Sequence, residues 1–424
     1  MARRQVAVVR ASSLRRRVCP AVLVGAIVIA SGAKPVFADP ASPTAVSPPP
    51  PSPPSPSMSD EAILGTPSLF KLESILTRYT VYQQDGHGWQ SRQSTATAPG
   101  SEDLSVYEPQ IQAVFAQGDA WRHTVSVPVD IVTAASPVVP RPDVITAASR
   151  YNQAGAVEDT STYKSDRDTS ISLHTAVHVE RMFRSWAFGG GWLRSFLDGD
   201  ATLGLSLNQA NDWFDAYDVT GTRMGHKNRS TTNGNIAFTR LLSTTTIAEV
   251  NYGFTLQSGE LGNTWSSVPL VGGGRTTETF PETRERHALV GRLSQWLPWS
   301  GALHLFARAY ADNWGIYAST TEVQLLQRLS PLLYIQGTYR LHVQTGASFF
   351  TTLLSTATTT PATADSDLQE LTAQSVGMKV AADIPVSPRI FGARSTHFDI
   401  GLTRYFRDND LTVWMFSCAS GLSF

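Results

Sequence analysis

Ionisable side chains in the C-terminal part of the chain share one phase of a two-residue period. They are His304, Arg308, Asp312, Glu322, Arg340, His342, Lys379 and Asp383. Because successive side chains of a β-strand point to opposite faces, all eight are expected to project to the same side of a sheet. Inside a barrel, such groups either line an aqueous passage and set its selectivity or cross-link into a polar plug. Their mixed signs suit both alternatives, since buried charges need partners.

Two further histidines, His174 and His178, form the sequence HTAVH. On a helix this pattern could suggest a zinc site, but Thr175 stands where a zinc protease has its glutamate base. On a strand the two histidines are about 13 Å apart, so we favour polar residues that line the wall over a shared metal site. The chain also has no GxSxG nucleophile elbow and no phosphate-binding glycine loop. We therefore predict no catalytic residues, no metal, no cofactor and no enzymatic activity.

Asp130 and Asp143 each begin one copy of a nearly repeated heptapeptide, DIVTAAS and DVITAAS. The copies end at Ser136 and Ser149, and three prolines lie between them, which makes the segment a poor central strand. We favour a pair of small-residue segments that turn the chain or fold inward against a wall. The alternatives are constriction of a pore, or an ion site in which the aspartate, threonine and serine oxygens hold a hard cation such as calcium.

The elements that must position these residues are β-strands. In residues 168–181 one phase carries Ile171, Leu173, Val177 and Val179, and the other carries Ser172, His174, His178 and Glu180. The same alternation of apolar and polar positions returns in 248–257, 303–312 and 339–344. Each run has about ten residues, the length with which a tilted strand crosses a bilayer.

The connections between these runs alternate in length. Short turns are predicted at 242–246, 297–301, 329–332 and 386–389, and long polar loops at 209–228, 259–283 and 347–370. Trp296 and Trp299 flank one short turn. Other aromatic residues gather near the opposite strand ends, namely Trp213, Phe214, Tyr217, Trp265, Trp314 and Tyr317. Short turns at one end, long loops at the other and two aromatic girdles predict an all-β fold, a transmembrane antiparallel β-barrel of about 14 to 16 strands.

The last strand ends on Phe424. Trp414, Phe416, Cys418, Leu422 and Phe424 share one phase, which resembles the terminal signal read by the barrel-assembly machinery, with Ala419 where a glycine is usual. We count fifteen strands, whereas a barrel with both ends in the periplasm needs an even number. We expect the missing or surplus strand near the doubled motif. Either VITAASRYN is a sixteenth strand, or residues 133–167 form one long loop.

The N-terminal residues predict export. Residues 1–38 combine seven basic residues and no acidic one with a short apolar run, and Val36 and Ala38 suit cleavage after Ala38. Residues 39–68 form a Pro/Ser-rich periplasmic linker, and 69–424 form the barrel. Without the signal peptide, 27 basic and 35 acidic residues remain, a net charge of −8 that leaves no basic surface for nucleic acid. We expect a bacterial, Gram-negative outer-membrane location, with membrane lipids and the assembly machinery as partners.

The chain resembles the bacterial family of predicted outer-membrane barrels called domain of unknown function 3570. The segments that carry the resemblance are Tyr107-Glu108-Pro109, the doubled DxxTAAS motif, and residues 280–298, 307–323 and 339–350. The resemblance implies the barrel fold and the membrane location. It implies no enzymatic reaction, because the family has no established one. Relatives are associated with flavin-transfer and thioredoxin-like proteins. Two functions follow: a pore or structural envelope barrel, or a plugged barrel that is accessory to an envelope flavin or redox system. The substrate and the oligomeric state stay open.

Overall fold

The computed structural model describes residues 70–90, 94–134, 152–180, 182–220, 222–262, 266–390 and 392–424. The predicted signal peptide and the whole predicted linker lie outside these residues. The described chain contains no helix that is long and apolar enough to cross a membrane.

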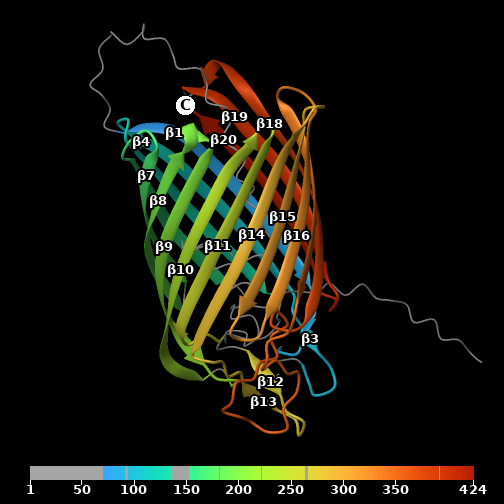
Figure 1. Ribbon diagram of the computed structural model, residues 1–424. Helices are drawn as coiled ribbons and strands as arrows, with labels where there is room; N and C mark the ends of the chain where they lie inside the picture. Colours follow the sequence, from blue (N-terminus) through green and yellow to red (C-terminus); the bar gives the residue numbers. More distant parts are fainter. Residues whose placement is uncertain are drawn as a thin grey trace, which may run out of the picture.

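Sixteen strands form a closed antiparallel barrel (Figure 1). In chain order they are β1 (Lys71–Asp85), β4 (Leu104–Gln117), β5 (Trp121–Ala134), β6 (Asn152–Lys164), β7 (Thr169–Glu180), β8 (Phe183–Phe196), β9 (Ala201–Tyr217), β10 (Arg223–Ser243), β11 (Thr246–Gly259), β14 (Thr283–Leu297), β15 (Gly301–Asp312), β16 (Tyr317–Arg328), β17 (Leu333–Gln344), β18 (Leu371–Ile390), β19 (Ala393–Arg407) and β20 (Thr412–Ser423). Each pairs with its neighbour in this order. The barrel strands have 12 to 21 residues, enough to cross a bilayer and extend beyond it.

The first and last strands close the barrel. Ser74 of β1 faces Ser423 of β20, and the pairing continues for the length of both strands to Asp85 and Thr412. The backbone N–H of Phe424 donates a hydrogen bond of 2.9 Å to the carbonyl of Glu73. Closure leaves no strand edge of the sheet unpaired, which is the condition for a sheet to lie in lipid.

The sixteenth strand is β6, residues 152–164. It begins at Asn152, the last residue of VITAASRYN, and the rest of that segment lies outside the described residues. The alternative of a single 133–167 loop is wrong, because residues 152–164 form a strand. Sequence periodicity missed β6 because its outward phase is polar. Asp159 and Ser161 share that phase with the exposed Val157, while the inward phase carries the small residues Ala154 and Ala156. Polar residues on the outer phase hide the alternation that marks the other strands.

The two ends of the barrel differ in their connections (Figure 1). Short turns, one of which contains the 3-10 segment Leu197–Gly199, lie at the end that carries the C-terminus. The described residues of the loops 86–103, 260–282 and 345–370 lie at the opposite end, where β12 (Ser267–Pro269) and β13 (Arg275–Thr277) form a small separate sheet. The sheet β2 (His87–Gly88) and β3 (Gly100–Ser101) is also at this end.

The predicted long loop 209–228 is wrong. β9 runs to Tyr217 and β10 begins at Arg223, so only residues 218–222 connect them. The polar residues that suggested a loop are paired within the extended strands, as in the ion pair of Asp212 and Arg229 at 2.7 Å. The turn predicted at 386–389 is also misplaced, because β18 continues to Ile390.

The outer surface is apolar. Leu173, Val177 and Val179 on β7 are each more than half exposed, at 56%, 55% and 52%, and large apolar side chains are exposed on the same phase of most other strands. A water-soluble monomer rarely exposes so large an apolar area. The alternate residues of each strand therefore face inward, and the outer surface is of the kind that contacts lipid.

The predicted aromatic girdles are only partly present. Trp213 and Tyr317 are exposed near the long-loop end, and Trp299 near the short-turn end. Trp314, in contrast, is 3% exposed and packs among the loops, and Trp265 lies outside the described residues. Trp296 pairs with Ala302, which gives it the inward phase of its strand, but it is 47% exposed and is not packed inside. Aromatic type alone did not separate residues at the lipid boundary from those packed inside.

Candidate functional site

The register brings four of the predicted inward residues together on the wall. Arg308 on β15 faces Thr320 on β16, which faces His342 on β17. Two residues nearer the short-turn end, Glu322 on β16 faces Arg340 on β17. Three neighbouring strands therefore place two arginines, a histidine and a glutamate in one patch of the inner wall.

Asp312 is fully occupied by structural hydrogen bonds. One carboxylate oxygen accepts hydrogen bonds from Arg284 Nε at 2.9 Å, from Arg284 Nη2 at 2.5 Å and from the hydroxyl of Tyr310 at 2.8 Å. The other accepts the backbone N–H groups of Trp314 at 3.0 Å and Ile316 at 2.9 Å. Asp312 thus fixes the turn after β15 and does not offer a free carboxylate to the lumen.

Aromatic rings support the arginines of this wall. The guanidinium of Arg308 lies 5.1 Å from the ring centre of Tyr310, and that of Arg340 lies 5.9 Å from the ring of Phe306. Arg340 is also 3.7 Å from Glu322. Arg308 and Arg340 are close enough to repel each other. Cation–π contacts offset part of the cost of holding such charges together.

Sequence reasoning missed the arginines of β14. The segment TRERHALVGR places Arg284, Arg286 and Arg292 on one phase, the phase that faces inward next to β15. Arg292 pairs with Glu249 at 3.1 Å across β11. The same period-two argument that selected Arg308 could have selected these three residues.

The two predicted histidines on this wall are oriented by polar neighbours. His304 Nδ1 lies 2.7 Å from the hydroxyl of Ser294. His342 Nδ1 lies 2.8 Å from Thr320 Oγ1, and its Nε2 lies 3.2 Å from Gln344 Oε1. No group of three or more histidine, cysteine, aspartate or glutamate side chains within the described part of the chain is arranged to hold a metal ion.

Lys379 and Asp383 belong to a second polar cluster nearer the short-turn end. Lys379 Nζ lies 3.3 Å from Asp399. His397 bridges the two acids, with Nδ1 at 2.6 Å from Asp383 and Nε2 at 3.1 Å from Asp399. His397 and Asp399 were not among the predicted lumen residues, although both share the inward phase of β19.

A shallow pocket in the wall joins these two clusters. Its volume is about 100 Å³, and its lining includes Glu322, Arg340 and Lys379 from three successive strands. Gly377 and Gly401 form part of its surface. The absence of side chains at these two positions leaves the space between the charged groups open.

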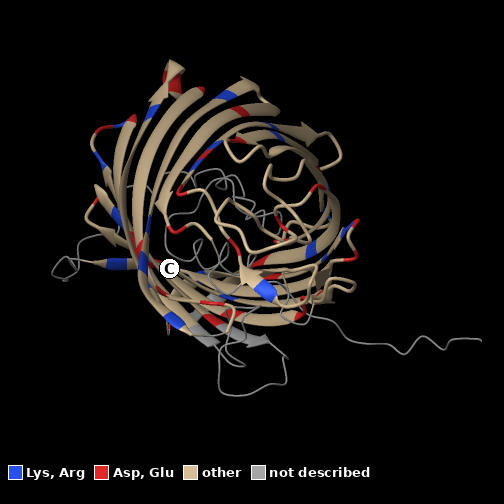
Figure 2. Ribbon diagram, turned by 90° about the horizontal axis from the view of Figure 1, so that it is seen from below, with Lys and Arg blue, Asp and Glu red and all other residues tan. Residues whose placement is uncertain are grey.

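The loops at the long-loop end fold inward and pack together. Trp314, Ile316, Ala347 and Leu368 form a buried apolar cluster, against which Phe280 and Phe349 also pack. Figure 2, which looks into this end of the barrel, shows the loops lying within its outline. We call the described residues of the loops 86–103, 260–282 and 345–370, together with the turn 313–316, the plug.

Two arginines tie the plug together. Arg275 donates hydrogen bonds to the carbonyls of Trp89 at 2.7 Å and Ser94 at 2.8 Å, which joins the first loop to the β12–β13 hairpin. Arg407 on β19 pairs with Asp367 of the loop 345–370 at 2.5 Å. The plug is therefore held both internally and to the barrel wall.

The HTAVH histidines lie on the inward phase of β7. His178 is fully buried, 4.0 Å from Glu180, and His174 Nδ1 is 3.1 Å from Thr160 Oγ1. Asp130 of the doubled motif is buried on β5, close to Glu108 and Glu180. The other residues of that motif, Ser136, Asp143 and Ser149, lie outside the described residues. Its three alternative roles stay predictions.

Comparison with solved structures finds outer-membrane proteins at low sequence identity. A bacterial polysaccharide outer membrane secretin has 7% identity and a TM-score of 0.43, and 82% of this chain covers 98% of that chain. A BenF-like porin from Pseudomonas fluorescens Pf-5 has 9% identity and a TM-score of 0.43, covering 83% and 99%. OprD from Pseudomonas aeruginosa has 10% identity and a TM-score of 0.39, covering 83% and 93%. No curated protein matches the chain.

One family model matches most of the barrel. It covers residues 155–410, from the third residue after the start of β6 to the turn before β20. This range is more than half of the 424-residue chain. The chain therefore belongs to the family described as protein of unknown function, DUF3570.

Proposed function

We propose that this protein is an outer-membrane pore that favours small anionic solutes and carries out no reaction. The observation that carries the proposal is the charge on the inward phase of four neighbouring strands, β14 to β17, where arginines outnumber carboxylates. The arginines are Arg284, Arg286, Arg292, Arg308, Arg328 and Arg340. The carboxylates on the same phase of these strands are Asp312 and Glu322. Positive charge that borders a narrow passage selects for anions.

The location rests on independent observations. The barrel is closed, its outer surface is apolar, and its strands are long enough to cross a bilayer. The N-terminal residues suit cleavage after Ala38 on export. Outer-membrane lipids and the barrel-assembly machinery are the partners that this proposal implies.

The plug favours a second candidate, a barrel closed to solutes that serves as an accessory in the envelope. Three loops and a turn pack together and are tied to the wall through Arg407. A closed barrel would use the arginines only as structural cross-links. Within the described residues, no observation favours a flavin or redox partner in particular.

Reversal potentials in a planar bilayer under a KCl gradient separate the candidates. Wild-type protein should give stable open steps with preference for chloride, and Arg286→Ala and Arg308→Ala should each shift the reversal potential towards potassium selectivity. Arg167→Ala is the matched control, because this exposed arginine lies in the short turn 165–168. Silent membranes with correctly assembled protein would instead support the closed barrel.

A further inference from the structure

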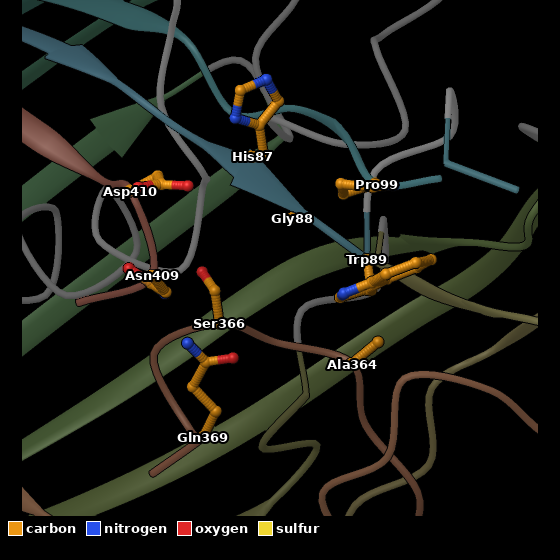
Figure 3. A pocket seen from close by; sticks show the side chains of 9 residues that line it. All are labelled: His87, Gly88, Trp89, Pro99, Ala364, Ser366, Gln369, Asn409 and Asp410. Atoms are coloured by element: carbon orange, nitrogen blue, oxygen red, sulfur yellow. The ribbon is translucent and has the colours of Figure 1, made fainter. Parts of the chain in front are cut away.

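A pocket of about 260 Å³ opens within the plug (Figure 3). The loops 86–103 and 345–370 and the turn between β19 and β20 form it. Its lining residues are His87, Gly88, Trp89, Pro99, Ala364, Ser366, Gln369, Asn409 and Asp410.

The walls of this pocket are held in place by contacts outside it. The carbonyl of Trp89 accepts hydrogen bonds from Arg275 at 2.7 Å and from Ser94 at 2.6 Å. A side chain at Gly88 would collide with the buried Glu102, since a Cβ there would lie 1.5 Å from Glu102 Oε1. The site is thus formed before any ligand arrives, which lowers the entropic cost of binding.

Two buried polar atoms belong to residues that line the pocket, the hydroxyl oxygen of Ser366 and Oδ1 of Asn409. Neither has a hydrogen-bond partner among the residues that the structure describes. Ser366 as a whole is only 3% exposed. Buried polar atoms nearly always have partners, and the exceptions gather where a ligand or ordered water binds.

The chemistry of the lining is divided between two sides. Trp89, Pro99 and Ala364 supply apolar surface on one side, and Ser366, Gln369 and Asn409 supply hydroxyl and amide groups on the other (Figure 3). Hydroxyl and amide groups both donate and accept hydrogen bonds. A sugar ring presents the matching surface, because its C–H groups are apolar and each of its hydroxyl groups donates and accepts.

Charge at the pocket disfavours anions. Asp410 is part of the lining, and the carboxylate of Glu102 lies directly behind Gly88. The volume is below the roughly 300 Å³ at which pockets for drug-sized ligands begin, so a single small ring is the fitting size. We propose that this pocket binds one neutral pyranose unit, either as a free monosaccharide or as a residue of a surface glycan.

Saturation-transfer NMR on the purified full-length barrel in detergent micelles tests the proposal. The probes are the methyl α-D-pyranosides of glucose, galactose and mannose, with D-glucuronate as the anionic counterpart. At least one neutral pyranoside should receive transfer, and glucuronate should bind at least tenfold more weakly. Trp89→Ala and Ser366→Val should each weaken the binding of the neutral probe at least tenfold, whereas Trp89→Phe should largely retain it.

Trp299→Ala is the matched control, because Trp299 is an exposed tryptophan near the short-turn end. It should leave binding unchanged, and heat-modifiable gel mobility should verify that every variant has assembled. Purified lipopolysaccharide core oligosaccharide is the second probe. Binding tighter than that of the monosaccharide identifies a surface glycan as the source, and equal or weaker binding identifies a free sugar.

Three results would overturn the proposal: no transfer to any neutral pyranoside, transfer that Trp89→Ala leaves undiminished, or binding of glucuronate as tight as that of the neutral probes. The first would mean that water alone fills the pocket. None of these results depends on conductance, so the sugar-binding proposal can be refuted while the anion-selective pore stands, and the reverse.

Discussion

Arg284 donates two hydrogen bonds to one carboxylate oxygen of Asp312, from Nε at 2.9 Å and from Nη2 at 2.5 Å. Its guanidinium also lies 4.0 Å from the ring centre of Trp314. This contact joins β14 to the end of β15 and to the first turn of the plug. Asp312 also accepts hydrogen bonds from two backbone N–H groups of that turn. The pair therefore holds the first turn of the plug against the barrel wall. The wall and the plug are one structural unit here.

The first prediction concerns this pair. Arg284→Ala leaves a buried carboxylate without its cation, which should cost about 3 to 5 kcal/mol of stability. The measurement is the melting temperature followed by loss of heat-modifiable gel mobility. Arg122→Ala is the control, because its pair with Glu73 is largely exposed and should contribute about 1 kcal/mol or less. Equal losses in both variants would show that the Arg284 pair is not effectively buried.

A second prediction concerns Arg275, which joins the first loop to the β12–β13 hairpin. Arg275→Ala removes hydrogen bonds to the carbonyls of Trp89, Ser94 and Ser267. The loop 86–103 should then detach more often, and protease should cleave it at least several-fold faster in the assembled barrel. Conductance should rise in the same variant if the plug narrows the passage. Unchanged cleavage, compared with Arg167→Ala, would contradict a clamping role for Arg275.

The barrel could largely be predicted from the sequence, whereas the plug could not. Alternation in β7, β11, β15 and β17 appears directly in the residue types, because lipid on one side and polar lumen on the other impose a period of two. β6 was not predicted, because polar residues occupy part of its outward phase. The plug depends on contacts between distant residues, such as Arg275 with Trp89, 186 positions apart, and no local pattern encodes them.

The arginines of the inner wall could also be predicted only in part. Periodicity placed Arg308 and Arg340 on one phase, and the register brings them near each other. It did not indicate that Arg284 is an ion-pair partner of Asp312. Partners across strands depend on the register, which a single strand's pattern does not fix.

A third prediction concerns pH and the plug. Burial raises the pKa of Glu278 from its usual 4.5 to about 7, and burial also raises the pKa of Asp365 well above its ordinary value. The folded plug therefore favours the protonated forms. Its stability is greatest below pH 4.5 and falls as the pH rises through 7, since Glu278 must then ionise in a buried place. Proteolysis of the plug should be faster at pH 8 than at pH 5.

The charged groups around Glu278 define the control for that prediction. Arg275 on β13 favours its ionised form, whereas Asp365 is the acidic neighbour that Glu278 repels. Glu278→Gln keeps an acceptor for the N–H of Ala364, which now donates to Glu278 Oε1 at 2.8 Å, but cannot ionise. The variant should show a smaller change in cleavage rate between pH 5 and 8. An unaltered pH profile would mean that Asp365 or another group controls the plug.

The last prediction concerns assembly and Phe424. Its backbone N–H bonds the carbonyl of Glu73 across the seam between β1 and β20, and its side chain lies near Gly392. Deleting Phe424 removes both the hydrogen bond and the aromatic ring, whereas Phe424→Ala removes only the ring. If the assembly machinery reads the ring, both variants should insert poorly and Phe424→Tyr should insert well. If closure of the seam matters instead, only the deletion should be impaired. Insertion is measured as the heat-modifiable fraction in outer-membrane preparations, and wild-type insertion of the deletion variant would contradict both roles.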